Sequence, residues 1–325
     1  MIIDDKVYGR QEIDDPLILE IIATPEMQRL KGVNQYGIWN LFNERYFTSR
    51  FDHCVGVYLL LHHFGASREE QTAGLMHDIA HTAFSHVIDY VFDDSATQTV
   101  HETFHTRVIF NSEIPNILRK YGLDVERLVD EHNFGILERA LPDLCADRVD
   151  YFLRDSLLLE KCSREEVRMI LGALNVYEQE LMLTDKDTAE MMEGRFRQMC
   201  LDFWGPPIQT GSYTLMANIL REALEKEIID ETDFFSTDEN VLKKLHDSLD
   251  ANIVHQLQLF STDKIVEGTA EEHTFHNRSK ARYINPKVFV EGKIIRTTDF
   301  VPGLQDKLEE FIEKYKEGYY IKIIE

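Results

Sequence analysis

The segment at residues 74–86, with the sequence GLMHDIAHTAFSH, places three histidines and one aspartate among apolar neighbours. His77 and His81 are four residues apart and would share one face of a helix, with Asp78 directly beside His77. Burying an unpaired aspartate is costly, so a fold that packs this segment has to bring a partner to Asp78. The adjacent side chains of His77 and Asp78 cannot form a good hydrogen bond with each other, but both can bind one metal ion through bonds of about 2.0–2.2 Å. The segment therefore favours a divalent metal site.

Further ligands for such an ion have to come from other segments, and two stretches offer candidates. His53 precedes an apolar helical run in TSRFDHC, and the stretch CADRVDYFLRDS carries Asp147, Asp150 and Tyr151 at i, i+3 and i+4. This second spacing can put all three side chains on one helix face. A solvent-exposed helix with internal salt bridges has the same charge pattern, so the spacing alone leaves both interpretations open.

Composition and charge narrow the classes of protein to which the chain can belong. Its 325 residues are 43% hydrophobic and 29% charged, as in a globular protein of one large or two smaller domains. No apolar run approaches the roughly 18–20 residues of a membrane span, and the N-terminal sequence is unlike a signal peptide, so we expect a cytoplasmic protein. The net charge of −23 disfavours nucleic acid and anionic membranes as partners but permits a small anionic substrate. The four cysteines lack CxxC spacing, which argues against a zinc knuckle.

Helical apolar spacing dominates residues 16–260, and the tail that follows changes character. Thr24 and Pro25 predict the start of a helix, because these residue types suit the N-cap and the first helical position. In the tail, PKVFVEGKIIRT predicts a hairpin with its turn at Glu291 and Gly292, and GYYIKII predicts a strand. We therefore predict a mainly α fold, a helical bundle with a small α+β C-terminal appendage. The expected units are a helical core at 1–185, a helical extension packed on it at 186–265 and the tail at 266–325.

The order of these motifs resembles that of the HD-domain superfamily of phosphohydrolases, whose defining pattern is H…HD…D. SRFDH is similar to the family's RFEH, HDIAHTAFSH to its HDLGHGPFSH, and DRVDYFLRD to its DKWDYFARD. QRLKGVNQYG, VHETF and YINPKVFVEGKIIRTTD also resemble family segments, so the resemblance covers most of the chain in the family's order. It is strongest to the bacterial and archaeal members, which are related to the vertebrate sterile-alpha-motif HD deoxynucleoside triphosphate triphosphohydrolase and to bacterial deoxyguanosine triphosphatases. The resemblance identifies the helical core as an HD domain.

The resemblance implies one bound divalent metal ion and assigns its ligands position by position, as His53, His77, Asp78 and Asp147. Two histidines and two carboxylates suit Mn, Fe, Co, Ni or Zn, and suit Mg less well. In such a family the ion polarises a phosphoryl oxygen and lowers the pKa of a bound water, which then attacks phosphorus.

The family's catalytic residues also have counterparts in the chain. His101, with Glu102 beside it, matches the pair implied as the general acid for the leaving oxygen. A histidine suits this task because its ordinary pKa lies near neutral pH. His81 and His86 match residues that contact the substrate phosphates and assist this step.

The resemblance further implies contacts to a nucleotide substrate. Arg50 and Arg148 would neutralise phosphate charge, for which the planar guanidinium is well suited. Gln35 matches a residue that hydrogen-bonds the sugar 3′-hydroxyl, and Tyr151 and Asp155 match residues that line the sugar. Together these three residues imply a deoxynucleotide. Because family members commonly form dimers or tetramers, we also expect a homo-oligomer.

Two departures from the family pattern leave the substrate open. The turn AHTA stands where the family has GHGP, and TGSYTLMANILREAL keeps Tyr213 but lacks the His-Lys pair of the triphosphohydrolases. The leading hypothesis is hydrolysis of a deoxynucleoside triphosphate. The alternative with the same metal site is a nucleoside mono- or diphosphate or another phosphoester, and the alternative of another class is a non-catalytic nucleotide-binding regulatory module. A zinc peptidase is disfavoured, because HDIAH has a shorter Asp in place of the Glu of HExxH, and no metzincin-type third ligand follows.

Overall fold

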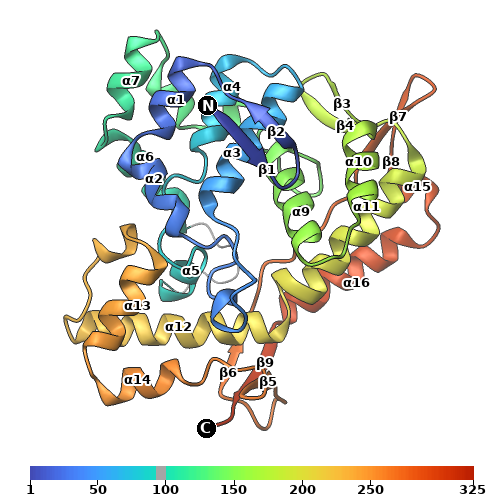
Figure 1. Cartoon of the computed structure of the whole chain (residues 1–325). Helices are drawn as coiled ribbons and strands as arrows, with labels where there is room; N and C mark the ends of the chain where they lie inside the picture. Colours follow the sequence, from blue (N-terminus) through green and yellow to red (C-terminus); the bar gives the residue numbers. More distant parts are fainter. Residues whose placement is uncertain (93–99) are drawn as a thin grey trace.

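A buried central helix, α3 (Arg50–His63), packs between α4 (Arg68–Met76) and α9 (Ala146–Leu158) (Figure 1). This computed structural model describes the backbone at residues 1–92 and 100–325 and the side chains at 1–92 and 103–325. Every residue of α3 from His53 to Leu61 is buried, which accounts for the nearly continuous apolar sequence of this helix. The three helices together form the frame that carries the predicted metal ligands.

The starts of the N-terminal helices follow the expected capping chemistry. Thr24 accepts a hydrogen bond from the backbone N–H of Met27 at the start of α2 (Pro25–Arg29), so the predicted N-cap and proline are confirmed. Ser49 and Ser67 cap α3 and α4 in the same way, through the N–H groups of Asp52 and Glu70. These caps fix where each helix begins and therefore which residues of its first turns face the core.

The predicted mainly α fold is confirmed, because helices make up most of the described chain. The other α-helices are α1 (Pro16–Ile22), α5 (Val87–Val91), α6 (Val100–Phe110), α7 (Ile114–Lys120), α8 (Val125–Leu128), α10 (Arg164–Ala173), α11 (Lys186–Met199), α12 (Pro207–Glu225), α13 (Asp238–Asp247), α14 (Ala251–Leu257), α15 (Thr297–Phe300) and α16 (Leu304–Glu317). Short 3₁₀ turns lie at η1 (Leu30–Gly32), η2 (Trp39–Leu41), η3 (Glu131–Asn133) and η5 (Asp233–Phe235), and a π turn lies at η4 (Cys200–Trp204).

Three small sheets accompany the helices. An N-terminal hairpin pairs β1 (Ile2–Asp5) with β2 (Gly9–Glu12). A second sheet has the order β3-β4-β7-β8, with β3 (Leu174–Tyr177), β4 (Glu180–Leu183), β7 (Lys287–Val290) and β8 (Lys293–Arg296). The third, of order β5-β9-β6 with β5 (Ile265–Glu267), β6 (Phe275–Asn277) and β9 (Tyr319–Ile323), packs on α12 (Figure 1).

The predicted α+β appendage is confirmed in the C-terminal region. Its hairpin β7–β8 turns at Glu291 and Gly292, both of which have positive φ (51° and 75°), as a tight hairpin turn requires. The strand predicted from GYYIKII is β9, which lies in the centre of its sheet and pairs antiparallel with β5 and β6. Here the local pattern was sufficient, because alternating β-branched residues and a glycine turn identify hairpin strands without reference to the rest of the chain.

Two hairpins within or before the helical region were not predicted. β1–β2 consists mostly of exposed residues, so it lacks the alternation that marks a half-buried strand. β3–β4 turns at Glu178 and Gln179, two non-glycine residues with positive φ (48° and 65°). In addition, β4 pairs in parallel with β7 through Leu183 and Val288, so segments of the predicted core and of the predicted tail share one sheet. The unit boundaries at 185/186 and 265/266 stay a prediction.

None of the helices in the described part of the chain combines the length and the apolar character that crossing a membrane requires.

An ion cluster links the C-terminal sheet to the segment before α9. Asp143 lies 3.0 Å from Lys287 Nζ and 2.7 Å from the Arg296 guanidinium. Burial alone would raise the pKa of Asp143, but these two cations hold it below its ordinary value. This contribution to stability is therefore present above about pH 4 and is lost as the pH falls through the lowered pKa.

Replacing Asp143 with asparagine is expected to lower the free energy of unfolding by about 1 kcal/mol or less near neutral pH, because the cluster is partly exposed. The difference from the wild type should shrink at an acidic pH below the lowered pKa of Asp143, where the wild-type carboxylate also loses its charge. Urea unfolding of both proteins at the two pH values measures this. A difference that stays the same at both pH values would contradict the assignment.

Candidate metal centre

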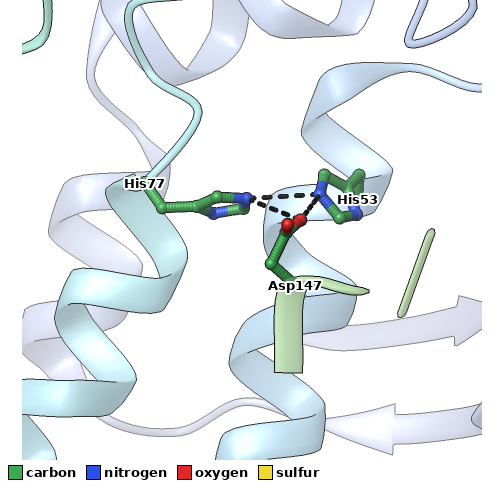
Figure 2. Close-up of side chains that lie close together, drawn as sticks. All are labelled: His53, His77 and Asp147. Atoms are coloured by element: carbon green, nitrogen blue, oxygen red, sulfur yellow. Dashed lines mark hydrogen bonds and ion pairs between the residues drawn. The ribbon is translucent and has the colours of Figure 1, made fainter. Parts of the chain in front are cut away.

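The four predicted metal ligands converge, although they come from three separate segments of the chain. His53 lies in the first turns of α3, His77 and Asp78 directly follow α4, and Asp147 lies in the first turn of α9. Figure 2 shows His53, His77 and Asp147 pointing toward one another. Nε2 of His53 is 2.9 Å from Asp147 Oδ1 and 3.2 Å from His77 Nε2, and the third side, His77 Nε2 to Asp147 Oδ1, is 3.4 Å.

Asp78 completes the group. Its Oδ2 is 3.5 Å from His53 Nε2 and its Oδ1 is 3.6 Å from His77 Nε2. The side chains of His53, His77 and Asp78 are nearly buried, whereas the Asp147 side chain is 23% exposed. The group can therefore be reached from solvent beside Asp147.

These distances and donor atoms fit one divalent ion. Ligand atoms about 2.0–2.2 Å from a common ion are about 3.0–3.5 Å apart, close to the separations observed here. His77 Nδ1 lies 2.8 Å from the carbonyl oxygen of Gly74, which can only accept, so the proton is on Nδ1 and Nε2 is free to bind an ion. His53 Nδ1 is similarly placed against Asp150 Oδ2, at 2.7 Å. Both Nε2 lone pairs thus face the same point.

The electrostatics of the group also call for a positive charge at its centre. Burial would raise the pKa of Asp78, but Arg50 and the neighbouring histidines hold it well below its usual range. Burial would lower the pKa of His77, but the carboxylates of Asp78 and Asp147 raise it to about 10. Without a bound ion, His77 is therefore a cation at neutral pH, with a second proton on Nε2. This proton takes the place of the metal ion that the carboxylates attract.

Comparison with known proteins supports the same interpretation of this group. Residues 50–155 match the HD domain family. The Bacillus subtilis protein YdhJ, which is uncharacterised, is 35% identical over 325 residues that cover all of this chain and 99% of YdhJ. The chain belongs to the HD-domain family of phosphohydrolases. Among its relatives, the metal-dependent phosphohydrolase cns2 of Cordyceps militaris is 26% identical over 300 residues, or 90% of this chain and 86% of cns2.

More distant comparisons agree with this HD-domain assignment. The human deoxynucleoside triphosphate triphosphohydrolase SAMHD1 is 31% identical over 167 residues, which cover 44% of this chain and 26% of SAMHD1. A phosphohydrolase from Bacteroides thetaiotaomicron has the same fold, with a TM-score of 0.71 at 17% identity and 99% coverage of both chains. A hypothetical protein from Aquifex aeolicus superposes with a TM-score of 0.65 at 21% identity, covering 94% of this chain and 93% of that protein. HD-domain membership implies a divalent metal, and the residues described above suit one.

Arg50 and His81 lie directly against the metal group of this HD domain. Arg50 Nη1 donates to Asp78 Oδ2 at 2.5 Å, and its Nε donates to Ser85 Oγ at 3.0 Å. His81 Nε2 is 3.2 Å from Asp78 Oδ1. The expectation that His77 and His81 share a helix face is wrong, because α4 ends at Met76 and the chain turns at residues 77–80. The turn still brings His81 back to Asp78.

His86 stands beside His81 and is neutral at physiological pH. The two rings are 5.0 Å apart at an interplanar angle of 85°. Burial lowers the pKa of His86 to about 3, although Asp89, 3.1 Å from its Nδ1, opposes this shift. The ring can therefore take part in hydrogen bonds but does not bring a positive charge. The phosphate contacts expected of both histidines stay a prediction.

Of the predicted sugar-lining residues, Tyr151 and Asp155 both contact Trp204, and Gln35 lies beside Arg50. Tyr151 follows Asp147 by one turn of α9, and its ring packs edge-on against Trp204 at 5.1 Å. Trp204 Nε1 donates to Asp155 Oδ2 at 2.6 Å, and burial raises the pKa of Asp155 to about 7. The carbonyl of Gln35 is 3.4 Å from Arg50 Nη2, and its side-chain Oε1 is buried without a partner in the described part of the chain. Their contacts to a sugar stay a prediction.

Arg148, a predicted phosphate ligand, has other partners in this structure. Arg148 already donates to the carbonyl oxygens of Arg139 and Asp143 and to Glu138, so it would have to leave these partners to bind a phosphate. The predicted general-acid pair, His101 and Glu102, lies outside the described side chains.

The structure also places Arg282 near the site, which sequence reasoning missed. Arg282 lies between β6 and β7, and its backbone N–H donates to Cys200 Sγ at 3.4 Å. Burial is the main cause of the low pKa of His86, and the nearby Arg282 guanidinium adds to it. Burial likewise raises the pKa of Tyr213 to about 12, against the opposing charge of Arg282. No motif spacing links residue 282 to the ligands, so only the fold could reveal this proximity.

Proposed function

We propose that the protein is a metal-dependent hydrolase of nucleotides, with a deoxynucleoside triphosphate as its substrate. The observation that carries the proposal is the convergence of two histidine Nε2 atoms and two carboxylates beside a buried arginine. This arrangement provides both a cation site and a fixed positive charge, which are the two requirements for binding and cleaving a phosphoester.

Each side chain of the group has a task that follows from its position. His53, His77, Asp78 and Asp147 would hold the ion, which supplies a Lewis acid for a phosphoryl oxygen and lowers the pKa of a water. The identity of the ion is part of the proposal, and Mn, Fe, Co, Ni and Zn suit these donors better than Mg. Arg50 keeps Asp78 ionised and oriented through its Nη1 contact.

Proton transfer to the leaving oxygen is proposed for His101, assisted by Glu102. His81 and His86 would bind phosphate oxygens, and the low pKa of His86 lets it act there as a neutral hydrogen-bonding group. His81 contacts Asp78, so a phosphate bound to His81 would lie next to the candidate metal position.

The choice of a deoxynucleotide rests on Gln35, Tyr151 and Asp155 and on the similarity to SAMHD1, whose name gives deoxynucleoside triphosphates as substrates. Tyr151 and Asp155 both contact Trp204, and the Gln35 carbonyl lies beside Arg50, so we propose that a sugar attached to the reacting phosphate reaches these residues. A nucleoside mono- or diphosphate is the second candidate, because the sequence after Tyr213 lacks the His-Lys pair of the triphosphohydrolases. A non-catalytic nucleotide-binding module and a homo-oligomeric assembly are further outcomes to be tested.

A substrate panel tests the proposal directly. The metal-loaded protein is incubated with deoxynucleoside and ribonucleoside mono-, di- and triphosphates, and the products are separated by chromatography. Nucleoside together with inorganic triphosphate is the expected result. Release of orthophosphate alone would support the second candidate, a phosphatase acting on nucleoside mono- or diphosphates. Tight nucleotide binding without turnover would support the non-catalytic regulatory module.

Replacing Arg282 with glutamine is expected to raise the KM for a phosphorylated nucleotide about tenfold and to leave the metal content unchanged. A tenfold change corresponds to about 1.4 kcal/mol, a modest value for a charge-assisted contact to phosphate. Steady-state kinetics and elemental analysis measure the two quantities, and Arg278→Gln, at an exposed position of the same segment, is the control. An unchanged KM would show that Arg282 does not contact the substrate.

A further inference from the structure

One carboxylate, Asp150, supports the candidate metal ligand His53 from behind. Asp150 is fully buried, and its Oδ2 lies 2.7 Å from His53 Nδ1, on the side of the ring opposite the candidate ion. Three further hydrogen bonds reach the same carboxylate. Tyr8 Oη donates to its Oδ1 at 2.8 Å, and Arg154 donates through Nε at 3.0 Å and through Nη2 at 2.9 Å. The four donors match the four lone pairs that a carboxylate offers, so its orientation is fixed from all sides.

Arg154 connects this carboxylate to the N-terminal hairpin. Its Nη1 donates to Asp5 Oδ2 at 3.0 Å, and the side chains of both residues are almost entirely buried. The other oxygen of Asp5 accepts the backbone N–H groups of Val7 and Tyr8, at 2.8 and 2.9 Å. The turn between β1 and β2 is thereby held in the conformation that directs the Tyr8 hydroxyl at Asp150.

The helix that carries His53 leaves space for this network. Gly56 lies one turn after His53 in α3, and a Cβ added to it would collide with Arg154 Nη2 and Asp150 Oδ1. A glycine in the interior of a buried helix lowers helix stability, so its presence here is explained by the close approach of the ion pair.

The charges of the network do not cancel behind the metal ligand. Asp5 and Asp150 bring two negative charges and Arg154 one positive charge, so a net negative charge lies behind His53. A carboxylate that accepts the Nδ1–H of a histidine orients the ring and makes its Nε2 a better metal ligand. The strands β1 and β2 are mostly exposed. What the hairpin contributes to the buried network behind His53 is the Asp5 carboxylate and the Tyr8 hydroxyl.

We propose that the N-terminal hairpin contributes to metal binding. Its Tyr8 and Asp5 are positioning residues that act on His53 through Asp150 and Arg154. This inference rests on the proposed metal-dependent function. It assigns to the hairpin a role in metal affinity that goes beyond the stability of the fold.

Two variants test the inference, Tyr8→Phe, which removes the hydroxyl alone, and Asp5→Asn, which removes one negative charge at nearly constant shape. Each is expected to weaken metal binding by up to about tenfold, less than the roughly 10- to 100-fold effect of removing a direct partner of a metal-binding histidine, because Tyr8 and Asp5 reach His53 only through Asp150 and Arg154. Competition between the protein and a chelating indicator for Co²⁺ measures the affinity. The visible spectrum of bound Co²⁺ should also shift, because the orientation of the His53 ring changes.

The matched control is Tyr121→Phe. Tyr121 Oη donates to Glu20 Oε1 at 2.7 Å, so this variant removes the same kind of bond from a pair that lies outside the network. Its Co²⁺ affinity and spectrum should equal those of the wild type. Thermal unfolding of each metal-free protein shows whether the hairpin variants remain folded.

The outcomes separate this inference from the proposed function. A wild-type protein that binds no Co²⁺ or other divalent ion would overturn both. A wild type that binds Co²⁺ together with variants that bind it equally well would overturn the role of the hairpin and leave the proposed function intact. Variants whose metal-free form is less stable, but whose affinity and spectrum are unchanged, would show that the hairpin is only structural.

Discussion

Replacing His77 and Asp78 together with alanine is expected to remove the bound metal and to reduce turnover at least about a thousandfold, or about 4 kcal/mol of transition-state stabilisation. The double variant removes two of the four side chains that converge on the candidate ion. It also leaves the buried Arg50 without the carboxylate that lies 2.5 Å from it. Elemental analysis of the purified protein and the substrate panel measure the two effects.

A surface pair provides the matched control for this variant. His132 and Asp130 form a histidine–aspartate pair with 3.1 Å between Nδ1 and Oδ1, but the histidine side chain is 98% exposed. Replacing both with alanine should leave metal content and turnover unchanged. If the variant at His77 and Asp78 retained one ion per chain, or retained its activity, the candidate metal centre would be wrong.

The second large effect is expected on stability, from Gly56→Ala in α3. The added methyl group would collide with the buried Asp150–Arg154 pair, so either this ion pair or the helix has to move. Breaking a buried ion pair costs about 3–5 kcal/mol, and overpacking a core costs about 1–3 kcal/mol. We therefore expect the free energy of unfolding to fall by about 3 kcal/mol or more, measured by denaturant unfolding of the metal-free protein.

Gly194→Ala in α11 makes the same chemical change where there is space for it. A Cβ at Gly194 has no neighbouring atom within 4 Å, and the residue lies in the interior of its helix. Alanine is favoured over glycine in a helix, so this variant should be as stable as the wild type or more stable by about 0.5–1 kcal/mol. Equal stabilities of the two variants would mean that the ion pair does not require the glycine.

The sequence alone determined the elements whose signals are local. Thr24 and Pro25 marked the start of α2, and Glu291 and Gly292 marked the turn of β7–β8, because caps and tight turns depend on a few neighbouring residues. The four residues now found together at the candidate metal centre were also chosen from sequence. There the signal was the resemblance to HD-domain proteins, since spacing by itself could not distinguish Asp147 from a residue of an exposed charged helix.

The tertiary structure decided which distant residues stand behind and around those ligands. Asp5, Tyr8 and Arg282 have no periodicity or motif that connects them to the site, and the sequence of β1–β2 did not even predict strands. Arg148, an expected phosphate ligand, instead donates to backbone carbonyl groups of the preceding loop. The physical reason is the range of the interactions: caps and turns form between residues a few positions apart, whereas buried charges are paired across the whole chain, and only the folded backbone brings such partners together.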